Sequence, residues 1–428
     1  MKEHWHKQEL LGEEIHSINL NQGCSLWCLP KRGVQQKVAL LAVGCGSLDS
    51  GPTANAPRGI AHFIEHCLFE KAAGDITDRF TALGGDINAS TSFTSTQYTL
   101  NCSDNLSEQI DLLFELAFNG HWTQAGIEKE RDIIKSEIHL YQDDADWGGF
   151  KAALGCVYGE HAISAEIAGR LEDLATIDEQ ILRSWHQAYY RPDNMNLFIS
   201  GDIDVAAMVE VCEKAIERHF EVSKVLPTAS VEFLSVLTTP ERGIEQRYPV
   251  SHPQLFMVYA DRQAGRTGSR LLECELALEL LLDIAFGPAS VAYSAWYESG
   301  LISGDSFSVE VYSERLFSFS LISAETPNPQ LLADEMDRVL GEMLQSGQWV
   351  EDLPRAKRKA YGQVVRSFEN AENCAALMQA AVSCGAHPFD YLNVFDTLNS
   401  DLFESCLQNC LRSGAGGVAY IYPCDEAR

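Results

Sequence analysis

The sequence predicts a protein of mixed helices and strands in two halves, and three observations support this. Its 428 residues are more than one typical domain core holds, so two or three domains are expected. Apolar residues recur with helical spacing in some segments and form short alternating or continuous strands in others. After a segment rich in Pro and polar residues, the same order of strands and helices starts again. We therefore expect an N-terminal domain over 1–222, a linker over 223–243 and a C-terminal domain over 244–428.

The charge of the chain limits its partners. A formal net charge of −29 argues against nucleic acid or an anionic membrane surface as the binding partner. The acidic residues either line a chamber that prefers basic peptides or form a solvated surface. The longest aliphatic run, Val38–Val43, is too short to span a bilayer, so no membrane span is expected.

The thirteen cysteines are read as reduced core thiols. The polar N-terminus lacks the apolar segment of a secretory signal, so we expect a cytoplasmic protein without a disulfide framework. Two pairs, Cys24 with Cys28 and Cys406 with Cys410, are spaced by four residues. Neither pair has a second Cys or His pair at zinc-finger spacing, and both are interpreted as structural thiols.

In the first half, the polar end that carries His4 and His6 is expected to be disordered. Alternation, apolar spacing and Gly or Pro breaks then predict these elements in order: strands between Ser17 and Leu29 and at Val38–Val43, a helix at Gly59–Phe69, a helix at Asp75–Leu83, one long strand at Asn88–Leu100, helices at Leu106–Asn119 and Gly126–Tyr141, a strand ending at Gly201, and a helix at Val205–His219.

In the second half the same signals predict a strand at Gln254–Tyr259, a helix at Arg270–Ala285, strands at Ser306–Tyr312 and Phe317–Ser323, and helices at Asn328–Ser346, Asp352–Cys384 and Phe389–Asn399.

The motif with the clearest chemistry is His62-Phe63-Ile64-Glu65-His66, inside an apolar run with helical spacing. Residues four apart lie on the same face of a helix, so His62 and His66 can bind one metal ion. Glu65 lies beside that ion. Two neutral imidazoles and a nearby carboxylate form the arrangement of a zinc hydrolase, in which the carboxylate takes a proton from metal-activated water.

A zinc site with two histidines needs a third protein ligand. Glu130 and Glu137 are the first candidates after the motif, because they are seven residues apart and share one face of the helix predicted at Gly126–Tyr141. His139 points elsewhere on that helix. Spacing alone does not select between the two glutamates, and a solvated role for either stays open.

The strand predicted at Asn88–Leu100 has one face of small polar residues. Such a strand suits a sheet edge to which an extended peptide adds itself through main-chain hydrogen bonds. An ordinary strand with a solvated face accounts for the same residues equally well.

Several of these segments together resemble the insulinase/pitrilysin family of zinc peptidases, in the short two-domain branch that includes mitochondrial processing peptidase. The resemblance extends to a bacillus-type bacterial subgroup and is carried by the segments Gly59–His66, Glu128–Ile138, Tyr190–Met195, Asp143–Trp147 and Tyr297–Ile302, and by Phe80, Gly84, Asn88, Ala89, Thr91 and Tyr98.

The resemblance implies roles that spacing could not assign. It makes Glu137 the third zinc ligand and Glu130 a carboxylate that orients the site. It places Asn88, Ala89 and Thr91 on the substrate-binding strand. It also implies an α+β fold of two similar domains, each a mainly antiparallel sheet covered by helices, which together form half of a clamshell.

One departure from the family pattern concerns the second domain. Active members usually carry Arg and Tyr there, in a segment reading roughly Arg-x-x-x-Gly-Leu-x-Tyr, and this chain has Trp296 and Ser303 at those places. Neither offers the charge-assisted donation that Arg supplies at an oxyanion. We therefore expect a heterodimer whose second, homologous subunit supplies the Arg and Tyr, rather than a homodimer.

The expected function is that of a zinc-dependent endopeptidase acting on peptides or extended segments, with Glu65 as the general base. The alternative is a non-catalytic assembly or scaffold subunit, a role that members of this family also serve. General peptide degradation and trimming of one dedicated precursor both remain open.

Overall fold

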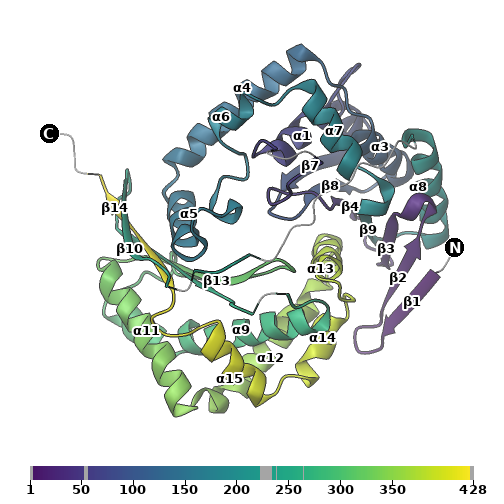
Figure 1. Cartoon of the computed structure of the whole chain (residues 1–428). Coiled ribbons are helices and arrows are strands. Elements are labelled where there is room, and N and C mark those ends of the chain that lie inside the picture. The colour runs from purple at the N-terminus through teal and green to yellow at the C-terminus, as the bar shows by residue number, and fades with distance from the viewer. Residues whose placement is uncertain (1–2, 53–55, 222–233, 238, 264, 425–428) are drawn as a thin grey trace. The chain divides into compact units, whose positions relative to one another are not determined.

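The computed structural model describes residues 3–52, 56–221, 234–237, 239–263 and 265–424. Contacts divide the chain into two compact units (Figure 1). Unit 1 comprises Met1–Ile138, Glu166–Val231 and Val365–Ala380, and unit 2 comprises His139–Ala165, Glu232–Val364 and Ala381–Arg428. The domain ends and the linker at 223–243 stay a prediction, since residues 222–233 of that linker region lie outside the described part of the chain.

The strands are β1 (Glu3–Gln8), β2 (Glu13–Asn19), β3 (Ser25–Pro30), β4 (Lys37–Val43), β5 (Glu70–Lys71), β6 (Gly74–Asp75), β7 (Gly85–Thr91), β8 (Thr96–Cys102), β9 (Met195–Gly201), β10 (Arg242–Tyr248), β11 (Gln254–Ala260), β12 (Ser308–Ser313), β13 (Ser318–Glu325) and β14 (Gly417–Pro423).

The α-helices are α1 (Ile60–Phe69), α2 (Thr77–Ala82), α3 (Leu106–Phe118), α4 (Gln124–Asp143), α5 (Ala145–Tyr158), α6 (Leu171–Leu174), α7 (Glu179–Tyr189), α8 (Val205–His219), α9 (Ser269–Phe286), α10 (Val291–Glu298), α11 (Pro329–Ser346), α12 (Trp349–Ser367), α13 (Ala371–Ser383), α14 (Asp390–Asn393) and α15 (Ser400–Asn409). Short 3-10 turns are η1 (Asn21–Gly23), η2 (Ala162–Ser164), η3 (Pro192–Asn194) and η4 (Val394–Asp396).

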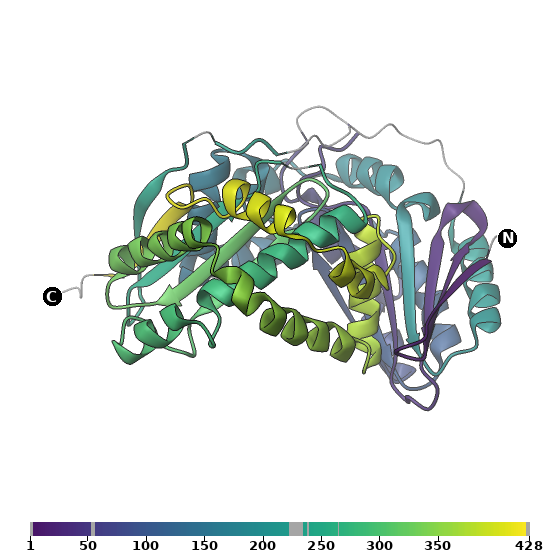
Figure 2. The ribbon, with the colours of Figure 1, turned by 90° about the horizontal axis from the view of Figure 1, so that it is seen from below.

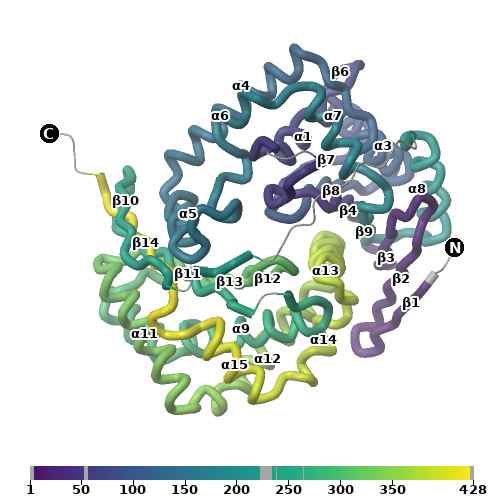
Figure 3. Tube along the Cα trace, in the orientation of Figure 1, coloured from purple at the N-terminus to yellow at the C-terminus, as the bar shows by residue number. Residues whose placement is uncertain are grey.

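Unit 1 is built on a seven-stranded sheet with the order β1-β2-β3-β9-β4-β8-β7, which Figure 3 lets the reader follow from β7 to β1. Only the β3–β9 pair is parallel, and the other neighbours are antiparallel. The interior strand β4 is buried along most of its length, as its aliphatic sequence requires. Helices α1, α3 and α8 pack on this sheet. The sheet ends at β7, so the strand proposed to bind substrate lies at an edge.

The prediction of one long strand over Asn88–Leu100 is wrong. The segment folds as a hairpin of β7 and β8, in which Thr91 pairs with Thr96. Ser92 closes the turn, because its N–H donates to Ser95 O over 2.7 Å and its hydroxyl also bonds to Ser95. Short hydroxyl side chains that bond nearby backbone favour turns over continued strand, and this local chemistry interrupts a run that is otherwise rich in β-branched residues.

Unit 2 is built on a five-stranded sheet with the order β10-β14-β11-β13-β12. Its pairs are antiparallel except for β10 with β14. Helices α9 and α11 pack on one face, which Figure 2 presents toward the viewer, and α5 packs against β14 and β11. The expected α+β class, with mainly antiparallel sheets covered by helices, is confirmed.

Two further expectations need correction. The N-terminal segment with His4 and His6 is not disordered, because it forms β1 and pairs with β2. The helix expected over Asp352–Cys384 is two helices, α12 and α13, separated at Phe368–Asn370. Among the described residues no single helix is long and apolar enough to cross a bilayer, although the bent pair α9 and α10 meets a test of length and composition alone.

Candidate functional site

Helix α1 presents the His-x-x-Glu-His motif from inside unit 1. Almost every residue of the helix is buried, His62 and Glu65 included. It begins at Gly59, whose φ of +84° lies in the left-handed region. A Cβ atom at Gly59 would lie 2.2 Å from the carbonyl oxygen of Ala168, so both the conformation and the close approach require glycine. The apolar run thus anchors the helix in the core and leaves His62 and His66 facing α4.

The two histidines and Glu137 meet between α1 and α4. His62 Nε2 lies 3.6 Å from Glu137 Oε1, and His66 Nε2 lies 3.5 Å from Glu137 Oε2. One donor atom from each of the three residues lies within 4.8 Å of the others. Their carboxylate and imidazole groups therefore converge on one point.

This donor set fits a zinc ion. Nitrogen and oxygen ligands bound at about 2.0–2.1 Å to one tetrahedral zinc ion lie about 3.3 Å apart. The separations of 3.5 and 3.6 Å are close to that value. Two imidazoles and one carboxylate leave one of four positions open, which is the pattern of a catalytic rather than a structural zinc site.

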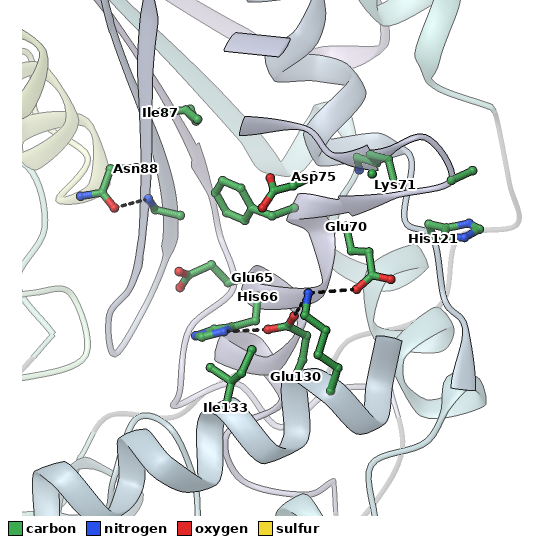
Figure 4. Close-up of a pocket in the computed structure, with 15 residues that line it drawn as sticks. Glu65, His66, Glu70, Lys71, Asp75, Ile87, Asn88, His121, Glu130 and Ile133 are labelled. Carbon is green, nitrogen blue, oxygen red and sulfur yellow. Dashed lines mark hydrogen bonds and ion pairs between the residues drawn. The ribbon is translucent and has the colours of Figure 1, made fainter. Parts of the chain in front are cut away.

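Glu130 fixes the ring of His66 from the other side. Its Oε2 lies 3.2 Å from His66 Nδ1, and its Oε1 lies 3.3 Å from Lys129 Nζ, which also reaches Glu70 at 3.5 Å. Figure 4 shows His66 directed at Glu130, with Glu65 above the same ring in this view. A carboxylate on Nδ1 leaves Nε2 as the atom that faces Glu137.

The two histidines differ in protonation when no metal is bound. Burial, with a smaller repulsion from His66, lowers the pKa of His62 to about 4, so its imidazole is neutral. Burial also acts to lower the pKa of His66, but hydrogen bonds to Glu130 and Glu137 outweigh it and raise the pKa to about 9. Burial would raise the pKa of Glu130, yet its bonds from His66 and Lys129 lower it. Glu130 is therefore a stable anion beside His66.

Glu65 lies beside the convergence point without joining the donor set. Thr91 Oγ1, at the end of β7, donates to Glu65 Oε2 over 2.5 Å. Burial raises the pKa of Glu65, partly offset by this bond and by His66. A carboxylate with a raised pKa, held by a hydroxyl, is suited to accept and return a proton.

The edge strand β7 and a cavity complete the described surroundings of Glu65. Asn88 Oδ1 accepts from the N–H of Ala89 over 2.9 Å, which Figure 4 marks. A cavity of about 760 Å³ is lined by Glu65 and His66. The rest of its lining combines acidic and basic side chains with the apolar residues Phe69, Ile87, Ala89 and Ile133. The chain thus has an edge strand and a cavity next to Glu65.

Sequence reasoning anticipated some of this geometry and missed some. Spacing left Glu130 and Glu137 open, and the family resemblance assigned Glu137 as the ligand and Glu130 as the orienting carboxylate. In the structure both lie at His66, on different ring nitrogens. His139 is exposed and bonds to Gln142, so it points away as expected. The contact of Thr91 with Glu65 was not anticipated, because strand alternation indicates a face but not a partner on another element.

Two models of one peptidase family match the chain. The model described as Insulinase (Peptidase family M16) matches residues 31–153, and the Peptidase M16 inactive domain matches residues 176–360. The uncharacterised zinc protease YmfH of Bacillus subtilis is 28% identical over 425 residues, covering 97% of this chain and 98% of that protein. The uncharacterised zinc protease YmxG of the same organism is 24% identical over 349 residues, covering 77% and 79%.

A solved structure gives the same picture of the fold. The crystal structure of an M16-like peptidase from Alicyclobacillus acidocaldarius superposes with a TM-score of 0.90 at 26% sequence identity. The superposition covers 96% of this chain and 99% of that one.

Proposed function

The chain belongs to the insulinase family of M16 peptidases, and from that premise we propose that it is a zinc-dependent endopeptidase acting on extended peptides. The observation that carries the proposal is the convergence of His62, His66 and Glu137 with Glu65 beside them. The names of YmfH and YmxG as zinc proteases agree with that donor set. The free cysteines of the described residues agree with a reducing compartment, for which we propose the cytoplasm.

The residues of this chain divide the chemistry among themselves. A zinc ion at this site supplies Lewis-acid chemistry, polarising the scissile carbonyl and lowering the pKa of a water molecule. Glu65 Oε is placed to accept a proton from an attacking water molecule and would return it to the nitrogen of the leaving amine. Thr91 holds the carboxylate in place for both transfers. Glu130 keeps His66 oriented with Nε2 toward the ligand position.

The substrate is proposed to bind as an added strand along the free edge of β7. Among the described strands none pairs with β7 on the side away from β8. Asn88 and Ala89 lie in the middle of this edge, and their bond to each other is one that an incoming main chain can replace. The cavity beside Glu65 and Ala89 is open to one substrate side chain.

A second subunit is proposed to complete the site. Trp296, at the place where the family pattern has Arg, is 4% exposed and stacks on Phe286 with ring centroids 5.7 Å apart. It is a core residue and cannot donate to an oxyanion. A homologous partner chain that carries Arg and Tyr supplies that donation in a heterodimer.

A metal measurement separates this proposal from a non-catalytic scaffold role. We expect His66→Ala to lose one zinc ion per chain relative to the wild type. His139→Ala, which removes an exposed histidine of α4, should keep the wild-type content. If the wild type holds no zinc that His66→Ala removes, the scaffold role is favoured.

A further inference from the structure

Three buried thiols meet in unit 2. Cys274 lies on α9, Cys406 lies on α15, and Cys410 follows the last turn of α15 as its C-cap. Their side chains are only 1%, 2% and 4% exposed, and their sulfur atoms all lie within 4.8 Å of one another. Cys274 and Cys406 are 132 residues apart in sequence and are brought together where α9 and α15 pack side by side (Figure 1).

The sulfur separations suit a shared metal ion. Cys274 Sγ lies 3.8 Å from Cys406 Sγ. Two thiolates bound at about 2.3 Å to one tetrahedral zinc ion lie about 3.8 Å apart. A disulfide requires about 2.05 Å and joins only two of the three sulfurs. Cys406 and Cys410 are spaced by one helical turn, which directs both side chains to the same side of α15.

A charged pair lies beside the thiols, and its guanidinium is the positive charge that a cluster of thiolates needs nearby. Asp261 directly follows β11, is 2% exposed, and has its Oδ2 4.0 Å from Cys274 Sγ. Arg266 donates to the same carboxylate oxygen. A buried ion pair is costly beside ordinary apolar thiols. It is less costly beside three thiolates and a divalent cation, because the guanidinium offsets part of the negative charge of the thiolates and of Asp261.

We propose that Cys274, Cys406 and Cys410 bind one structural zinc ion through their three thiolates, with the pair of Asp261 and Arg266 beside Cys274 as the charged groups nearest to the ion. Zinc is the divalent cation that tetrahedral thiolate-rich sites select. On binding, the three S–H groups release their protons to solvent and no electron is transferred. The ion ties α9 to the end of α15, and it uses none of the residues proposed for catalysis.

Zinc stoichiometry tests the site with matched variants. The wild type, purified without a metal-binding tag and dialysed against a weak chelator, should hold about two zinc ions per chain. Cys406→Ser/Cys410→Ser should retain about one, and so should His62→Ala/His66→Ala. Cys384→Ser, which removes another buried thiol of unit 2, should retain both. Loss of the first ion only in the histidine variant, and of the second only in the thiol variant, shows two independent sites.

A second measurement uses only the wild-type protein, so it does not depend on whether a variant folds. The cobalt-loaded wild type should show thiolate-to-cobalt charge-transfer absorption, which a histidine and carboxylate site cannot produce. In the native zinc protein, alkylation followed by mass spectrometry should find the three cysteines protected until a strong chelator is added. Cobalt loading without charge-transfer absorption, or a disulfide between Cys274 and Cys406 in the purified protein, would overturn the assignment.

Discussion

At the scale of single residues, Glu130 decides how firmly His66 is held. It is buried, bonds to His66 Nδ1 at 3.2 Å and is itself held by Lys129. We expect Glu130→Gln to weaken zinc binding by about 10–100-fold, because a neutral amide neither fixes the imidazole as well nor raises its basicity. Competition with a chromophoric chelator measures the affinity.

The matched control for this variant is Glu128→Gln, on the same helix. Glu128 is exposed, and its carboxylate accepts a hydrogen bond from the side-chain amide of Gln124. It should bind zinc as the wild type does. Equal affinities for Glu130→Gln and Glu128→Gln would contradict the orienting role of Glu130.

Asp49, which lies outside the metal site, makes a pH-dependent contribution to the free energy of unfolding. Burial raises its pKa to about 6, against partial opposition from the hydrogen bonds of the Gly46 N–H and of Tyr189. Because the folded-state pKa lies above the unfolded value, the stability that the neutral carboxyl contributes is full below the unfolded pKa and is lost as pH rises through about 6.

Asp49→Asn should therefore stabilise the protein at neutral and alkaline pH, by about 2 kcal/mol, since Asn stays uncharged and keeps an acceptor for Gly46 N–H. Thermal unfolding of the variant and the wild type at about pH 5 and about pH 8 measures the difference. The unfolding midpoint of the variant should exceed that of the wild type by an amount that grows with pH. A gap that is constant or shrinks as pH rises contradicts it.

At the scale of elements, the start of α1 depends on Gly59. Its φ of +84° and its approach to Ala168 leave no space for a side chain. Gly59→Ala should lower the free energy of unfolding by more than about 2 kcal/mol and should also reduce zinc binding, because it displaces the helix that carries both histidines. Gly155→Ala, in α5 with nothing within 4 Å of its added Cβ, should be neutral or slightly stabilising. Similar unfolding midpoints for the two variants would show that α1 is less constrained.

Long helices with a regular apolar spacing could be predicted from the sequence. A turn inside a β-rich segment and a strand exposed on both faces could not. Helices such as α3 and α8 lie where apolar spacing puts them. The β7–β8 turn was missed because its four residues, Ser92 to Ser95, include no Gly or Pro. The terminal strand β1 reads as polar, since both of its faces are largely exposed, and only its pairing with β2 orders it.

The same limit applies to the candidate site. Residues on one helix, His62, Glu65 and His66, are found by spacing, because four residues make one turn. Glu137 lies on another helix and needed a family resemblance to be singled out. The thiol cluster shows the limit most clearly, since Cys406 and Cys410 were read as core thiols while their third partner, Cys274, lies 132 residues away from Cys406.

At the scale of the whole molecule, the isolated chain should be a weak enzyme. Without an Arg at the oxyanion it should fall short of the assembled enzyme by about 10²–10³ in rate. Capture of the tagged chain from its native host should bring down a homologous chain that carries the Arg and Tyr, and adding that partner should restore cleavage. Full activity of the isolated chain, as monomer or homodimer, would contradict the heterodimer.

The measurement that tests the central claim most directly compares peptide cleavage by the wild type and by Glu65→Gln, each as the complex captured from the native host. Both should hold the same amount of zinc, because Glu65 is not in the donor set. The wild type should cleave extended peptides, and Glu65→Gln should be slower by about 10²–10⁴, the usual contribution of a general base. Equal cleavage by the two complexes, or none by the wild type, would contradict the account of this chain as a zinc peptidase with Glu65 as its base.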